Sequence, residues 1–79
     1  MKAKPKRYEI LARVGVDDLD KVKSALTSVL GCGQLHERKV SPYLMFSFTT
    51  KHYIYIRQFR AKIKAKLPHA QFVERRLFE

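Results

Sequence analysis

The residues with the clearest chemical potential are basic and aromatic side chains in the second half of the chain. Between Glu37 and Glu74 the sequence holds eight Lys and Arg residues and no Asp or Glu, together with seven of the nine aromatic residues. Lys and Arg neutralise phosphates, and a tyrosine such as Tyr43 can stack on a base. Because the whole chain carries a net charge of +10, we expect a polyanionic partner, and nucleic acid fits that description best.

The segment 51–66 supplies most of the expected phosphate contacts. If it forms a helix, its cations and tyrosines fall on two stripes, one on each side of the apolar face. The predicted nucleic-acid-binding residues are Arg38, Lys39, Lys51, Tyr53, Tyr55, Arg57, Arg60, Lys62, Lys64 and Lys66. The alternative is a set of long side chains that only carry their charges past the edge of the core. A helix without a single acid favours binding.

Length and composition limit the architecture to one small domain. A chain of 79 residues buries only about 60% of its unfolded surface and has room for a single core. One cysteine, Cys32, cannot form an internal disulfide, and no apolar run approaches the roughly 20 residues of a membrane span. We therefore expect a soluble cytoplasmic protein with no membrane contact. Residues 1–6 would form a flexible basic arm and residues 7–79 the folded domain.

Hydrophobic periodicity predicts the elements that position these side chains. Alternating apolar residues predict strands, and apolar residues three or four apart predict helices. The predicted strands cover 8–16, 34–40, 43–49 and 71–78, and the predicted helices cover 18–30 and 51–67. Thr50 is the expected cap of the second helix, and Pro68 marks its end. The register of the last strand stays open, since Phe72 and Val73 belong to opposite faces.

The order β-α-β-β-α-β, with short connections, predicts an α+β fold: a four-stranded antiparallel sheet with two helices on one face, the ferredoxin-like sandwich. This fold hosts many unrelated activities, so it does not decide the function. The uncovered face of the sheet would carry Leu11, Arg13, Tyr43, Met45 and Ser47, with either His36 and Arg38 or Glu37 and Lys39 beside them.

That uncovered face has two interpretations. It resembles the exposed sheet by which RNA-recognition motifs stack bases, although the segment 43–49 lacks the glycines and the aromatic spacing of that family. Leu11, Tyr43 and Met45 are equally suited to a contact between two copies of the chain, because a small sheet with an apolar open face often buries it on itself. We expect a homodimer.

Residues for catalysis or metal binding are few. Cys32, His36, His52 and His69 lack the tight repeated spacing of a zinc site, and no Ser-His-Asp or Cys-His pattern is present, so we expect no metal and no cofactor. Asp17 is the one catalytic candidate. It resembles, in position only, the aspartate with which some small ferredoxin-like nucleases hold a divalent metal. Its simpler role is the cap of the helix that follows.

Three functions follow from these observations. The leading hypothesis is a small nucleic-acid-binding module that grips the phosphate backbone through the second helix, with a slight preference for RNA or a single strand. The second is a protein-interaction module, such as a small regulator or inhibitor, that docks on an acidic partner. The third is a metal-dependent nuclease centred on Asp17.

Overall fold

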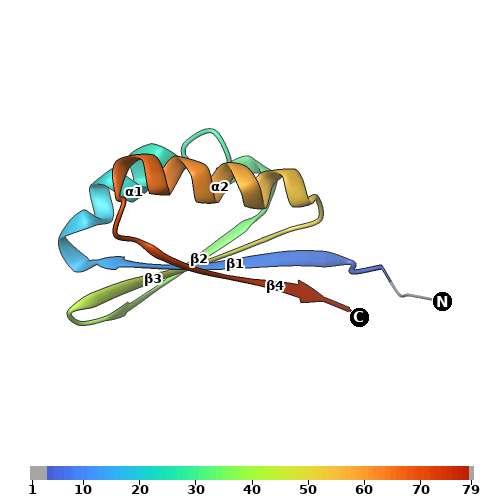
Figure 1. Cartoon of the computed structure of the whole chain (residues 1–79), viewed down its shortest axis with the longest axis horizontal. Helices are drawn as coiled ribbons and strands as arrows, with labels where there is room; N and C mark the ends of the chain where they lie inside the picture. Colours follow the sequence, from blue (N-terminus) through green and yellow to red (C-terminus); the bar gives the residue numbers. More distant parts are fainter. Residues whose placement is uncertain (1–3, 79) are drawn as a thin grey trace.

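A computed structural model describes residues 4–78. The strands are β1 (Arg7–Gly15), β2 (Gln34–Val40), β3 (Tyr43–Thr50) and β4 (Gln71–Leu77), and the helices are α1 (Leu19–Leu26) and α2 (Tyr53–Lys66). Two single turns of 3-10 helix, η1 (Val16–Asp18) and η2 (Leu30–Cys32), flank α1. Every predicted element is therefore present, and Figure 1 shows both helices on one side of the sheet.

The sheet has the strand order β2-β3-β1-β4, and each neighbouring pair is antiparallel. This order, with both helices on one face, confirms the predicted ferredoxin-like arrangement. β1 and β3 are the central strands, and β1 pairs along the whole of β3, from Tyr8 opposite Thr50 to Gly15 opposite Tyr43. β2 and β4 form the two edges, so the side chains of Arg38 and Lys39 lie on an edge strand.

The core lies between the sheet and the helices. Along β1 and β3 every second side chain is buried, as the alternation predicts, and Phe46 and Phe48 are fully covered. From α2, Ile56, Phe59 and Ile63 complete this layer. The rings of Phe48 and Phe59 stack with their centroids 5.1 Å apart, so the apolar stripe of α2 is held directly against the central strands.

The last strand places Phe72 toward the helices. Phe72 pairs with the buried Ala12 of β1 and packs against the core, whereas Val73 is 58% exposed on the open face. Because side chains alternate along a strand, Glu74 also lies on the helix side. This settles the register that the sequence pattern left open.

The first helix is shorter than predicted. It ends at Leu26, and the chain then makes a turn before η2, whereas the apolar spacing predicted a helix over residues 18–30. The hydroxyl of Thr27 bonds to the main-chain oxygens of Lys23 and Ser24, both at 3.2 Å. A side chain that competes for helix carbonyls in this way weakens the helix end.

The predicted cap of the second helix is wrong, because Thr50 is the buried last residue of β3. Its hydroxyl donates to the Cys32 carbonyl (2.8 Å) and accepts the His52 N–H (3.4 Å), and α2 begins only after His52.

Close packing at this end of the sheet also requires Gly33. A Cβ there would lie 2.4 Å from the Thr49 carbonyl oxygen, so a larger residue would push against the strand backbone.

The predicted basic arm, residues 1–6, falls partly outside the described residues, which begin at Lys4. The main-chain N–H of Lys6 donates to the Leu77 carbonyl (2.9 Å), so at this residue the chain is already attached to the sheet. Within residues 4–78, no helix is both long and apolar enough to cross a bilayer.

Candidate nucleic-acid interface

The exposed side of α2 has three parallel rows of side chains. A row of uncharged residues, Ile54, Gln58, Ala61 and Ala65, points away from the sheet, and all four are exposed. We call this row the α2 crest. On the side of β4 lie Tyr53, Arg57, Arg60 and Lys64, the β4-side flank. On the side of α1 lie Tyr55, Lys62 and Lys66, the α1-side flank.

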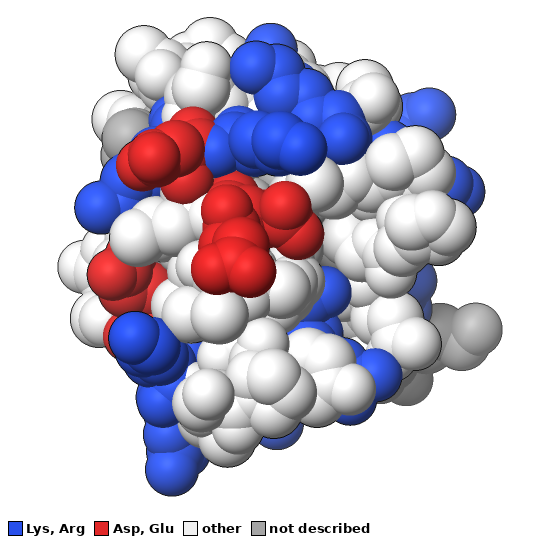
Figure 2. Space-filling view, turned by 90° about the vertical axis from the view of Figure 1, so that its left-hand side faces the viewer, with Lys and Arg blue, Asp and Glu red and all other residues white. Residues whose placement is uncertain are grey.

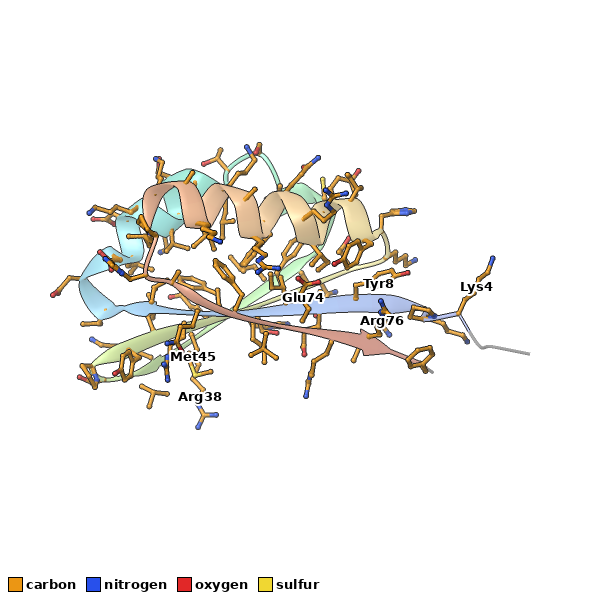
Figure 3. The ribbon with its side chains drawn as sticks, in the orientation of Figure 1. Lys4, Tyr8, Arg38, Met45, Glu74 and Arg76 are labelled. Atoms are coloured by element: carbon orange, nitrogen blue, oxygen red, sulfur yellow. The ribbon has the colours of Figure 1, made fainter. Side chains whose placement is uncertain are left out.

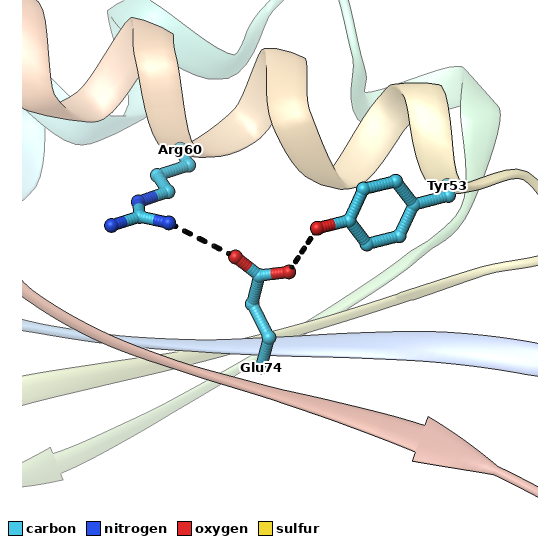
Figure 4. Close-up of polar contacts among 3 residues, drawn as sticks. All are labelled: Tyr53, Arg60 and Glu74. Atoms are coloured by element: carbon cyan, nitrogen blue, oxygen red, sulfur yellow. Dashed lines mark hydrogen bonds and ion pairs between the residues drawn. The ribbon is translucent and has the colours of Figure 1, made fainter.

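An acid from another element joins the β4-side flank. Glu74 of β4 accepts a hydrogen bond from the Tyr53 hydroxyl (2.6 Å) and forms an ion pair with Arg60, whose Nη1 is 3.1 Å from its Oε2 (Figure 4). The Arg60 guanidinium also lies 5.8 Å from the centre of the Phe72 ring. Arg57 and Lys64 are exposed and have no such partner within residues 4–78.

The two tyrosines of the predicted stripes, Tyr53 and Tyr55, contact other residues of the protein. The ring of Tyr53 meets that of Tyr8 edge to face, with the centroids 5.3 Å apart, and its hydroxyl is held by Glu74. This hydrogen bond, followed by partial burial and the negative charge of Glu74, raises the pKa of Tyr53 above its ordinary value of 10.0. Tyr55 is partly buried against the core, and its ring contacts His52.

The α1-side flank is closed in by the neighbouring helix. Lys66 Nζ donates to the Ser24 hydroxyl of α1 (3.2 Å), and Lys62 is half-buried. Lys51 does not belong to this row, because the helix begins at Tyr53 and Lys51 precedes it. It lies instead beside a cavity of about 240 Å³, which Arg7 and Cys32 also line.

The remaining predicted contacts lie away from α2. Pairing of β2 with β3 places Arg38 opposite Met45, so both side chains project from the open face, and Figure 3 shows them on the side of the sheet away from the helices. His36 shares that face with Arg38, and Lys39 belongs to the other. The predicted site residues therefore form separate surfaces rather than one.

The open face mixes apolar and basic side chains. Leu11 and Val73 are neighbours across β1 and β4, and Met45 lies in the next row. Glu9 forms an ion pair with Arg75 (2.7 Å) and accepts the Ser47 hydroxyl hydrogen bond (3.1 Å). The cations that remain on this face give it a positive charge.

Asp17 does not act as the predicted cap. It is exposed in η1, the N-cap position of α1 is occupied by Asp18, and neither end of η1 nor the start of α1 has a capping hydrogen bond from a side chain. The chain makes a 3-10 turn before α1, which displaces Asp17 from the cap position. Among residues 4–78, no three His, Cys, Asp or Glu side chains come together as a metal site would require.

Sequence reasoning missed Glu74, the acid that organises the β4-side flank. Glu74 is 14 residues from Arg60 and 21 from Tyr53 along the chain, so no local spacing connects them. The available signal was the strand pattern: once Phe72 is assigned to the core face, Glu74 must share that face and meet α2.

Comparisons with known proteins give a fold and no function. No protein-family model matches the sequence, and no curated protein matches it either. Among solved structures, the chain is similar to a de novo designed protein called Foldit4, with a TM-score of 0.71 and 14% sequence identity over 92% of this chain and 96% of that one. At this identity the similarity shows the shared ferredoxin-like fold alone.

Proposed function

We propose that this protein binds nucleic acid through phosphate contacts made from the exposed side of α2. The observation that carries the proposal is the arrangement of that helix. It has five Lys and Arg residues and no acid, and an uncharged crest runs between its two basic flanks. Only Arg60 among these cations has an ion-pair partner within residues 4–78.

This arrangement favours duplex DNA over the single strand expected from the sequence. Stacking on Tyr53 or Tyr55 would require breaking contacts that both rings make inside the protein. A helix with its side chains is about 10–12 Å across, and the major groove of B-DNA is about 12 Å wide. With the helix in the groove, the exposed cations of the β4-side flank, Arg57 and Lys64, can reach the adjacent phosphates while the crest faces the bases. Ile54, 52% exposed on the crest, suits contact with a thymine methyl group.

Binding of short duplexes at several salt concentrations tests the proposal. Duplex DNA should bind more tightly than duplex RNA of the same sequence, because the major groove of A-form RNA is too deep and narrow for a helix. The logarithm of the affinity should fall linearly with the logarithm of the salt concentration, by about 0.9 per neutralised phosphate. Equal affinity for both duplexes would contradict insertion in a groove.

Two double variants locate the interface. Arg57→Ala with Lys64→Ala removes two charges from the β4-side flank and should lower the salt slope by roughly 0.9 for each phosphate that these side chains neutralise. Arg38→Ala with Lys39→Ala removes the same charge from the β2 edge and should change the slope less. A larger decrease in the second variant would move the interface to the edge strand.

The open face of the sheet supports a second role, self-association. Leu11, Met45 and the exposed Val73 form an apolar area there, which we propose packs on a second copy of the chain. Because the helices cover the other face, such a dimer would carry its two α2 helices on opposite outer sides. It would join two duplexes rather than bind one.

A cytoplasmic location fits the proposed function, since Cys32 has no second cysteine to pair with.

A further inference from the structure

A cavity at one end of the sheet is lined by charged side chains, of which only Lys66 also belongs to a flank of α2. Its volume is about 520 Å³, which lies within the range of small-molecule sites. It lies where the end of β1, the start of α1 and the connection from α2 to β4 meet. The ionisable side chains that line it, apart from Tyr43, are Arg13, Asp18, Lys21, Lys66 and His69.

The cavity exists because β4 is shorter than the strand beside it. β4 pairs with β1 only as far as Arg13, opposite Gln71, so Val14 and Gly15 extend beyond the paired region. The connection at residues 67–70 passes over this gap, and Val14, Gly15 and the connection all line the cavity. A bond from the Val16 N–H to the Pro42 carbonyl (3.2 Å) fixes the start of η1 on the hairpin loop. The cavity walls are therefore attached to the sheet.

The basic side chains of this cavity form no ion pairs among the described residues, although Asp18 also lines it. Arg13 donates to the side-chain oxygen of Gln71 and lies over the Tyr43 ring, 4.7 Å from its centre. Lys66 donates to the neutral hydroxyl of Ser24. Within residues 4–78, neither of these cations nor Lys21 forms an ion pair. Three cations that line one cavity repel one another, and a bound phosphate would relieve that repulsion.

The other side chains fit the nucleoside part of such a ligand. Tyr43 lines the cavity and is 45% exposed, so the part of its ring that Arg13 leaves uncovered can contact a base. The Asp18 carboxylate also lines the cavity, and a Cβ on Gly15 would lie only 3.2 Å from its Oδ2. A carboxylate only accepts hydrogen bonds, so it would repel phosphate but accept the hydroxyls of a ribose.

The surroundings favour a compact ligand over a continuous strand. Asp17, Asp18 and Asp20 lie together at the start of α1. Figure 2 shows acidic side chains gathered on this end of the molecule, with basic side chains around them. An acidic patch beside the cavity repels a long phosphate backbone but leaves room for a single phosphate among the cations.

We propose that this cavity binds a nucleoside monophosphate, either free or as the phosphorylated end of a strand. Lys21, Lys66 and His69 contact the phosphate, Tyr43 contacts the base, and Asp18 accepts a hydrogen bond from the ribose. The cavity is separate from the α2 crest, so this inference does not depend on DNA binding by that helix.

Nuclear magnetic resonance of the labelled full chain tests it, with AMP, adenosine and inorganic phosphate as probes. AMP should shift the amide signals of Gly15, Asp18, Leu67 and residues 69–71, and it should bind more tightly than either fragment. No shift with AMP, or shifts confined to the exposed side of α2, would overturn the proposal. Equal binding of AMP and inorganic phosphate would overturn the nucleoside contacts.

A matched pair of double variants separates direct phosphate binding from net charge. Lys21→Ala with Lys66→Ala should weaken AMP binding at least about tenfold, the effect expected when a charge-assisted hydrogen bond to phosphate is removed. Lys23→Ala with Lys64→Ala removes the same charge from the same two helices outside the cavity, and should leave AMP binding within about twofold. Equal weakening in both variants would contradict the site.

The two sources of the ligand are distinguished with oligonucleotides. A short single strand carrying a 5′ or 3′ phosphate is compared with the same strand ending in hydroxyls. If the terminal phosphate tightens binding to the wild type but not to the Lys21 and Lys66 double variant, a strand end is a ligand. AMP binding without that difference identifies the free nucleotide. Absence of both effects would refute the cavity as a nucleotide site.

Discussion

Replacing Glu74 by Gln should strengthen DNA binding while weakening the fold. Glu74 holds Arg60 at 3.1 Å and accepts the Tyr53 hydroxyl bond at 2.6 Å. Gln keeps a neutral acceptor for Tyr53 but releases the guanidinium of Arg60. The freed Arg60 then lies beside Arg57 and Lys64 on the β4-side flank, where it can bind an additional phosphate.

The size of both effects follows from the interactions of Glu74. The Arg60 and Glu74 side chains are 50% and 29% exposed, and exposed ion pairs contribute about 0.2–1 kcal/mol. Glu74→Gln should therefore cost up to about 1 kcal/mol, and Glu74→Ala, which also removes the acceptor, roughly 1–2 kcal/mol. In a domain of this size each kcal/mol lowers Tm by about 4–8 °C. One additional neutralised phosphate should steepen the salt slope by about 0.9.

The assay combines thermal unfolding with fluorescence anisotropy of a labelled duplex at several salt concentrations. Glu37→Gln is the matched control, because it raises the net charge equally from the exposed β2 edge. Tighter binding with a steeper slope in Glu74→Gln alone supports a local role of the flank. If Glu37→Gln improves binding as much, net charge explains the effect. An unchanged slope in Glu74→Gln would refute the inclusion of Arg60 in the interface.

Four further predictions concern stability, catalysis and assembly. Because the folded-state pKa of Tyr53 is raised above 10.0, its contribution to stability is present below pH 10 and lost as the pH rises through the folded pKa. The stability difference from Tyr53→Phe, measured by unfolding at each pH, should shrink accordingly; a constant difference would contradict this. Gly33→Ala should destabilise the fold by about 1–3 kcal/mol. Gly31→Ala, with nothing within 4 Å of the new Cβ, should be within about 0.5 kcal/mol of the wild type or slightly more stable. Equal unfolding midpoints for the two variants would contradict this. Asp17→Ala should change stability by less than about 0.5 kcal/mol, and gel assays should detect no cleavage of nucleic acid with Mg²⁺ or Mn²⁺; cleavage that disappears in this variant would restore the nuclease hypothesis. Light scattering should find dimers of the wild type that strengthen with salt, since like charges on the open face are then screened, and monomers of Met45→Glu; a monomeric wild type at high concentration would remove the proposed dimer.

The order and type of the elements were predictable because the core uses simple periods. In β1 and β3 every second residue is apolar, and Ile56, Phe59 and Ile63 of α2 repeat at helical spacing. The element ends were less predictable. Thr50 does not cap α2, because its hydroxyl donates to the carbonyl of Cys32 in η2, 18 residues away along the chain. No local pattern encodes that hydrogen bond.

The candidate sites divide in the same way. Helical periodicity correctly grouped Arg57, Arg60 and Lys64 on one flank, because this grouping depends only on helix geometry. Whether Arg60 is paired with an acid depends on Glu74, and the register of β4 is what places Glu74 beside this flank. The end cavity was not predicted. It forms where Val14 and Gly15 of β1 extend beyond the last residue that pairs with β4, and a sequence pattern does not show where that pairing ends.

The end of α2 brings the two proposed sites within one helical turn. Lys64 belongs to the β4-side flank and Lys66 to the cavity, because residues two apart on a helix point to nearly opposite sides. Both also lie in the last turn of α2, where a positive charge favours the helix through its dipole by about 0.3–1 kcal/mol. Removal of either lysine should therefore lower stability by a similar amount, and stability alone does not assign a function to them. If Lys64→Ala weakens duplex binding but not AMP binding, and Lys66→Ala weakens AMP binding but not duplex binding, the two surfaces are separate sites. If either substitution weakens the binding of both ligands equally, the effect comes from the total charge of this helix end and not from two sites.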